Sequence, residues 1–186
     1  MEGGVVSGGL DLNNFKSAIT KTFGANSACL QYADEVLTSA TKYEIDPLRL
    51  MALMNQESSC NVGSSDSSAG AVGLMQIKDW DVDIGNGVSC SGSISGLKTK
   101  ADLIGPNNVQ NNIDCGALIL KTYYDIHGSK TSSYKCDEYK FKLTPNYVDK
   151  IEPAVNIQYT GWDAALRYYN GWACAELKDD GKSEVL

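Results

Sequence analysis

The chain has 186 residues, of which 42% are hydrophobic and 21% are charged, and its formal net charge is −7. This size is enough for one domain with a substantial core. The acidic balance argues against nucleic acid and against an anionic membrane surface as the main partner. No apolar run approaches the roughly 20 residues that a membrane-spanning helix needs, so no membrane insertion is expected.

Residues 1–10 are glycine-rich and are predicted to be a flexible leader, because they lack the basic and apolar regions of a signal peptide. Two amphipathic packing helices are predicted next, over residues 11–23 and 30–43. Gly24 is a typical end signal for the first of them. We assign no chemistry to either helix.

The next predicted helix begins with two strong start signals. Asp46 can cap free backbone amides, and Pro47 suits the first helical position because its missing N–H costs nothing there. Within residues 48–54 only Arg49 is charged, so this helix is expected to be buried in the centre of the domain. It ends on a carboxylate, Glu57.

The region after this helix is rich in glycine and serine. Residues 58–70 are predicted to be a loop, and residues 69–77 a glycine-bearing turn that enters another short helix. Residues 78–106 show little periodicity and are predicted to be a long excursion, irregular or with short strands. Cys90 is a candidate anchor for it, since connections of this length are usually functional or cross-linked.

The C-terminal half is predicted to be mainly helical. Its expected segments are a helix over 107–126, a polar loop over 129–144, helices over 146–157 (with a break at Pro153) and 161–169, and a charged, frayed tail over 178–186. The fold class is therefore mainly α, with α+β as the wider description. We expect a single domain over residues 11–177, a compact helical globule with a central buried helix and a long irregular loop or small β region.

Cysteine usage points to an oxidising compartment. The even number and wide spacing of the cysteines, without a C-x-x-C pair and with His127 as the only histidine, disfavour a zinc site. Up to three disulfides are the favoured interpretation, and six buried free thiols are the alternative. The sequence does not choose among the pairings of Cys29, Cys60, Cys90, Cys115, Cys136 and Cys174.

Glu57 is the main candidate for catalysis. Desolvation at the end of an apolar helix and the negative end of the helix dipole both raise the pKa of a carboxyl group. A glutamic acid that is protonated near neutral pH can act as a general acid on a glycosidic bond. The alternative is a structural carboxylate that caps a helix or forms an ion pair.

Four motifs occur in the order typical of one enzyme family: Glu57-Ser58, Gly73-Leu74-Met75-Gln76, Asn112-Ile113-x-x-Gly116 and Tyr169-Asn170-Gly171. Over residues 43–172 the chain resembles the soluble lytic transglycosylase family, which is related in fold to goose-type lysozyme. The resemblance implies a lysozyme-like fold and an enzyme that acts on the glycan strands of peptidoglycan. No cofactor and no metal are expected.

The resemblance also implies roles for individual residues. Glu57 would be the sole catalytic acid and base, and the substrate would be bound by Ser58, Met75, Gln76, Tyr169 and Asn170. Ser58 would orient the carboxyl or the sugar, and Met75 and Gln76 would line the cleft. Tyr169 would hold the Glu57 carboxyl through its hydroxyl, and Asn170 would shape the same wall of the cleft. Each has an alternative: core filling for Met75, simple packing for Tyr168 and Tyr169, and close helix packing for Asn112, Ile113 and Gly116.

The implied mechanism needs only one carboxylate. Glu57 protonates the oxygen between MurNAc and GlcNAc and then takes the proton of the MurNAc C6 hydroxyl, which closes a 1,6-anhydro ring. A lysozyme-type hydrolase of the same bond needs a partner carboxylate, for which the candidates are Asp66, Asp79, Asp81 and Asp83. A non-catalytic glycan-binding or assembly module is the third alternative.

The expected location is extracytoplasmic: secreted, periplasmic, wall-associated or virion-associated. Envelope, phage or secretion machinery is a candidate partner.

Residues 79–85 resemble a calcium loop, but Ile84 and Cys90 stand where an EF-hand has Gly and Glu, so a solvated acidic loop is favoured. Trp80, Trp162 and Trp172 are candidates for sugar-stacking platforms or, more commonly, for core packing.

Overall fold

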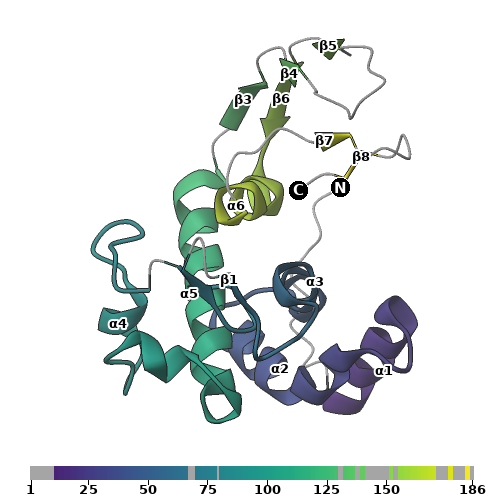
Figure 1. Cartoon of the computed structure of the whole chain (residues 1–186), viewed down its shortest axis with the longest axis vertical. Coiled ribbons are helices and arrows are strands. Elements are labelled where there is room, and N and C mark those ends of the chain that lie inside the picture. Colours follow the sequence, from purple (N-terminus) through teal and green to yellow (C-terminus); the bar gives the residue numbers. More distant parts are fainter. Residues whose placement is uncertain are drawn as a thin grey trace. The chain divides into compact units, whose positions relative to one another are not determined.

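The computed structural model describes residues 11–66, 70–78, 80–129, 132–136, 139–140, 151–152, 155–170, 176–177 and 183–184. The chain divides into two compact units, Met1–Thr122 and Tyr123–Leu186. The boundary falls inside one long helix, α5 (Val109–His127) (Figure 1). The predicted leader, residues 1–10, lies outside the described residues, and the expectation of a single domain over 11–177 stays a prediction.

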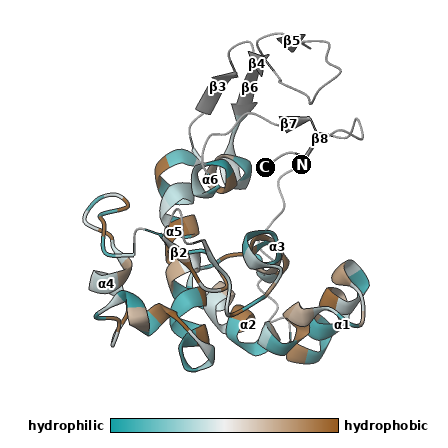
Figure 2. Ribbon diagram, viewed as in Figure 1, coloured by the Kyte–Doolittle hydropathy of each residue, from teal (hydrophilic) through white to brown (hydrophobic). Residues whose placement is uncertain are grey.

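Three helices pack against one another in the first unit: α1 (Leu12–Phe23), α2 (Ala33–Lys42), which follows the 3₁₀ turn η1 (Ala28–Tyr32), and α3 (Pro47–Ser58). The predicted start and end of α1 are confirmed. The Asp11 carboxylate accepts hydrogen bonds from the first free backbone amides of α1, and Gly24 ends the helix at φ 91°. Hydrophilic and hydrophobic residues alternate along α1 (Figure 2), as expected of a helix that buries one face.

The start of α3 is also confirmed. The Asp46 side chain accepts a hydrogen bond from the backbone N–H of Arg49, and Pro47 is the first helical residue. The buried side chains of α3 are Leu50, Met51, Leu53, Met54 and Ser58. Ala52 and Gln56 are exposed, so the helix is buried on most sides but not on all.

The segment after α3 corrects one prediction. β1 (Ser65–Asp66) pairs antiparallel with β2 (Ala71–Val72), and the short helix expected within 69–77 is absent from the residues described there. Instead the chain turns back after β2, and Val72 and Ile77 exchange two backbone hydrogen bonds of 3.1 and 3.0 Å. Positive φ angles at Gly73 (76°) and Gln76 (47°) are incompatible with a right-handed helix, which explains the difference.

The long excursion over 78–106 is irregular, as predicted. It contains the single turn α4 (Cys90–Ser93) and the short 3₁₀ helices η2 (Lys100–Leu103) and η3 (Pro106–Asn108). The Cys90–Cys115 disulfide attaches it to α5. The predicted anchoring role of Cys90 is therefore confirmed.

Within the first unit, α5 is more deeply buried than its one-sided sequence pattern predicts. Every residue from 112 to 117 is buried. Asp114 tolerates burial because its carboxylate accepts hydrogen bonds from Ser39 (2.5 Å), Lys42 (2.7 Å) and Gln110 (2.9 Å). The bonds from Ser39 and Lys42 attach α5 to α2, and the bond from Gln110 lies within α5.

The second unit contains both a confirmed helix and the largest corrections. α6 (Gly161–Tyr169) has the predicted bounds. The loop expected over 129–144 and the helix expected over 146–157 are wrong, because β3 (Ser132–Cys136) pairs antiparallel with β6 (Val155–Tyr159), and β4 (Tyr139–Lys140) with β5 (Ile151–Glu152). The tail is also not simply frayed, since β8 (Ser183–Glu184) pairs with β7 (Glu176–Leu177).

The described chain is mainly helical, with short two-stranded pairings, so the predicted fold class is confirmed. Among the described residues, none of the helices combines the length and the hydropathy that crossing a membrane requires.

Candidate active site

Glu57 lies in the last turn of α3, where the chain is firmly fixed. Ser59 and Cys60 follow with φ angles of 52° and 58°, so two consecutive left-handed residues end the helix. Such conformations cost about 1 kcal/mol or more each unless the surroundings hold them. Cys60 is held by its disulfide to Cys29, and both cysteines are buried. The disulfide therefore fixes the chain three residues after Glu57.

The Glu57 carboxyl is half-buried, and this burial raises its pKa from 4.5 to about 7. Desolvation is the cause, and no charged side chain contributes to the shift among the residues that the structure describes. At neutral pH the protonated and ionised forms are therefore comparably populated. A group in that state can donate a proton and then accept one.

The raised pKa predicts a pH-dependent stability. A folded-state pKa above the unfolded value means that the folded protein binds the proton more tightly, so the stabilising contribution is complete below pH 4.5 and is lost as the pH rises towards 7. Glu57→Gln removes this titration. We expect the melting temperature of the wild type, relative to that of Glu57→Gln, to fall between pH 4.5 and 7 and to level off above.

Thermal melts of the two proteins across this pH range test the prediction. A constant difference between the two melting temperatures would contradict it, because a glutamate with the same pKa in the folded and unfolded states adds no pH dependence to stability.

The structure places the Ser58 hydroxyl inside its own helix. Its Oγ donates a 3.1 Å hydrogen bond to the Met54 carbonyl, and only 9% of the residue is exposed. Nearby, Asn55 Oδ1 lies 3.4 Å from Cys29 Sγ; this is a contact rather than a hydrogen bond, because a disulfide sulfur carries no proton. The role of Ser58 in orienting the carboxyl or the sugar stays a prediction.

The half-buried Gln76 side chain is hydrogen-bonded through the nitrogen end of its amide. Its Nε2 donates to the carbonyls of Gly73 (2.8 Å) and Ser64 (3.3 Å). Both amide protons are thus used, which also settles the orientation of the amide, since an oxygen in that place would face two carbonyl oxygens. Oε1 is the atom left to accept a hydrogen bond from a ligand.

Met75 has no exposed surface, and its side chain lies against Gly116 of α5. A Cβ atom at Gly116 would come within 2.7 Å of Met75 side-chain atoms, so glycine makes room for the methionine. This arrangement favours the core-filling interpretation of Met75, and its contact with a sugar stays a prediction.

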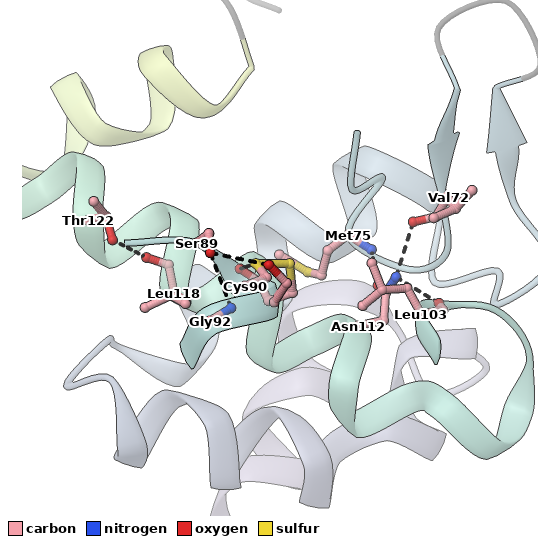
Figure 3. Close-up of a disulfide and its surroundings, with 11 residues drawn as sticks. Val72, Met75, Ser89, Cys90, Gly92, Leu103, Asn112, Leu118 and Thr122 are labelled. Atoms are coloured by element: carbon pink, nitrogen blue, oxygen red, sulfur yellow. Dashed lines mark hydrogen bonds between the residues drawn. A yellow bond between two sulfur atoms is a disulfide. The ribbon is translucent and has the colours of Figure 1, made fainter. Parts of the chain in front are cut away.

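Asn112 joins α5 to two other segments, the turn at Val72–Met75 and the residues around Leu103 (Figure 3). Its Oδ1 accepts from the Met75 backbone N–H (2.8 Å), and its Nδ2 donates to the carbonyls of Val72 and Leu103 (both 3.1 Å). The sequence interpretation assigned Asn112 to helix packing and missed this polar anchor. The signal was present, however, as an asparagine one helical turn before Gly116 on the buried face of a helix.

Gly73 is the glycine that this anchor requires. A Cβ there would lie 2.2 Å from Asn112 Nδ2 and 3.0 Å from the Leu103 carbonyl oxygen, and its φ is 76°. Gly96 has a similar φ of 87° but no atom within 4 Å of such a Cβ.

These two glycines give a matched prediction. We expect Gly96→Ala to lower the free energy of unfolding by about 1 kcal/mol through backbone strain alone. Gly73→Ala should cost about 3 kcal/mol or more, because the steric conflict with Asn112 adds to the strain. Urea unfolding of both variants measures the difference, and equal losses would show that the Asn112 contact does not restrict this position.

Tyr169 and Asn170 lie at the end of α6, in the second unit. Tyr169 is the last helical residue, and Asn170 is the C-cap, whose backbone N–H donates to the Leu166 carbonyl (3.0 Å). The proposed contact of Tyr169 with the Glu57 carboxyl and the wall role of Asn170 stay predictions.

Two pairs of aromatic rings stack on one another in the second unit. Trp162 stacks on Tyr124 with ring centroids 4.0 Å apart, and Tyr168 stacks on His127 at 3.6 Å. One face of Trp162 is therefore covered by protein, which favours packing over sugar stacking for that face. Trp80 is half-buried, and Trp172 lies outside the described residues.

Two of the candidate partner carboxylates are described. Asp83 accepts hydrogen bonds from the backbone amides of Gly85 (2.8 Å) and Gly87 (3.1 Å), which fits a carboxylate that shapes its own loop. Asp81 is exposed. Asp79 and the side chain of Asp66 lie outside the described part of the chain, so the calcium-loop alternative stays untested.

A family comparison agrees with this geometry. The model of the transglycosylase SLT domain matches residues 35–138, which is more than half of the chain. The chain belongs to the transglycosylase SLT domain family. No curated protein and no solved structure matches it significantly.

The SLT match covers α3 with Glu57, the Gly73–Gln76 turn and the Asn112–Gly116 face of α5, but it ends before Tyr169 and Asn170. An SLT domain has a lytic transglycosylase-type function directed at peptidoglycan, and this is the general function of the chain. The first unit thus contains the family motifs around Glu57.

Proposed function

We propose that this SLT domain is a lytic transglycosylase that cleaves the β-1,4 bond between MurNAc and GlcNAc and leaves a 1,6-anhydroMurNAc end. Glu57 is the sole acid and base of this reaction. The observation that carries the proposal is the Glu57 pKa of about 7, which burial produces without a contribution from another described carboxylate.

The chemistry follows from this single group. Protonated Glu57 donates its proton to the glycosidic oxygen as the bond to MurNAc C1 breaks, and the carboxylate that results stabilises the positive charge that develops at C1. It then takes the proton from the MurNAc C6 hydroxyl, and O6 bonds to C1. Glu57 ends protonated, as it began, and no water is consumed.

The substrate contacts are proposed on the sites described above. Gln76 Oε1 accepts a hydrogen bond from a sugar hydroxyl or an N-acetyl N–H, because its own donors are already used. Ser58 and Met75 in the first unit, and Tyr169 and Asn170 in the second, are the other residues proposed to bind the substrate. The disulfides Cys29–Cys60 and Cys90–Cys115 fit an oxidising, extracytoplasmic compartment, where the peptidoglycan substrate lies.

Mass spectrometry of peptidoglycan digested by the purified protein tests the proposal. Anhydro products are lighter than reducing-end products by one water. We expect only anhydro ends, and they should be absent from a digest with Glu57→Gln. Reducing-end MurNAc alone would instead identify a lysozyme-type hydrolase, and no released fragments would favour a non-catalytic glycan-binding module.

A further inference from the structure

The side-chain amide of Asn112 is buried and forms its hydrogen bonds with backbone atoms of the protein. Only 1% of the residue is exposed, and the amide makes three hydrogen bonds, all to backbone atoms: Met75 N–H, the Val72 carbonyl and the Leu103 carbonyl. Both amide protons and one acceptor site are occupied in this way. Asn112 therefore does not face a ligand, and any effect that it has on one is transmitted through the Val72–Met75 turn or through the segment at Leu103.

The same face of α5 is shaped to receive the turn after β2. Asn112 approaches Gly73 so closely that a Cβ there would lie 2.2 Å from Nδ2, and one helical turn further on Gly116 accommodates the Met75 side chain. Figure 3 shows Asn112 between Val72, Met75 and Leu103, close to the Cys90 disulfide. The same face of α5 thus makes polar contacts with the turn through Asn112 and an apolar contact through Gly116.

Gln76 directly follows the residue that Asn112 binds. Its φ of 47° is a left-handed conformation, which is unfavourable for a residue other than glycine and persists only where the surroundings impose it. The hydrogen bond from Met75 N–H to Asn112 fixes the peptide next to it. The backbone that Asn112 holds therefore leads directly into the residue that carries Oε1.

We propose that Asn112 is a positioning residue for substrate binding, and that it acts by holding the Val72–Met75 backbone so that Gln76 Oε1 meets the glycan. This inference rests on the proposed function, in which Gln76 contacts the sugar. A displacement of about 1 Å at a binding group is enough to lower kcat/KM substantially.

A double-mutant cycle on peptidoglycan cleavage tests this role. Asn112→Asp keeps the oxygen that accepts from Met75 N–H but replaces Nδ2 with a second oxygen. The carbonyls of Val72 and Leu103 then lose the group that donates to them. We expect it to lower kcat/KM by about 10- to 100-fold, mainly through KM, and to leave the pH dependence of kcat unchanged. In a Gln76→Ala background the same change should lower kcat/KM by no more than about 2-fold.

Asn111→Asp is the matched control, because Asn111 is the neighbouring asparagine on α5 and donates only to the Asp102 carbonyl (3.2 Å). It should leave KM unchanged.

Asn112→Ser, which keeps a small hydroxyl donor, is a milder second variant if Asn112→Asp does not fold, and it should show the same dependence on Gln76. Melting temperatures should fall equally in both backgrounds.

An equal loss of kcat/KM in the presence and absence of Gln76 overturns the inference, since a purely structural residue acts independently of Gln76. If the wild type releases anhydro fragments and Glu57→Gln does not, equal losses of kcat/KM in the two backgrounds refute the positioning role alone. If the wild type releases no fragments, the proposed function fails and the inference fails with it.

Discussion

Glu57→Gln is expected to lower the rate of peptidoglycan cleavage by about 1,000-fold or more while the fold is retained. The proposed reaction uses one group first as acid and then as base, and each role contributes typically 10²–10⁴-fold. Glutamine is nearly isosteric with glutamic acid but carries no proton that titrates near pH 7. The loss should appear in kcat at every pH, because no other described side chain takes over the proton transfer.

The measurement is the release of soluble fragments from purified walls, together with circular dichroism and thermal melts that verify folding. Glu44→Gln is a suitable control, since it makes the same chemical change at an exposed glutamate of the same unit. The control should be as active as the wild type. Unchanged lysis by Glu57→Gln would exclude both the transglycosylase and the hydrolase interpretation.

Local signals in the sequence predicted the helices that begin and end on capping residues. Asp11 and Gly24 limit α1, Asp46 and Pro47 start α3, and each acts within one helical turn of its own position. Because these interactions are short in sequence, single-sequence reasoning can recover them. The end of α6 was predicted from a local signal too, Asn170-Gly171.

The β3–β6 pairing could not be recovered so easily, because it joins segments about twenty residues apart. Residues 155–159 do alternate apolar and polar types, which is a strand signal, but the longer segment over 146–157 was interpreted as a helix with a break at Pro153. The register that pairs Tyr134 with Ile157 depends on the fold. Pairings of this kind carry little local information.

The candidate site likewise has features that the sequence predicts and features that depend on the folded chain. Glu57 was identified from its motif and its place at the end of an apolar helix, but the size of its pKa shift depends on how much of the carboxyl is buried by the folded chain. The anchoring by Asn112 requires three segments to meet, and no spacing rule predicts that. The same limit applies to the disulfides, since Cys29–Cys60 and Cys90–Cys115 are defined only by proximity in the fold.

Removal of the Cys29–Cys60 disulfide is expected to impair catalysis beyond its effect on stability. The two bonds span 31 and 25 residues, so loop-closure entropy assigns each of them about 3–4 kcal/mol. Only the Cys29–Cys60 bond holds the left-handed turn that follows Glu57. In the double variant Cys29→Ala/Cys60→Ala, the end of α3 should loosen and water should reach the Glu57 carboxyl.

Hydration lowers the pKa of that carboxyl from about 7 towards 4.5, because desolvation is the cause of the shift. Less of the acid form is then present at pH 7, so cleavage should slow at neutral pH and the pH optimum should move to lower pH. Cys90→Ala/Cys115→Ala is the control of matched stability cost, and its pH optimum should stay in place. Equal movement of both pH profiles would mean that general loosening of the fold, and not the turn after Glu57, sets the acidity of the catalytic group.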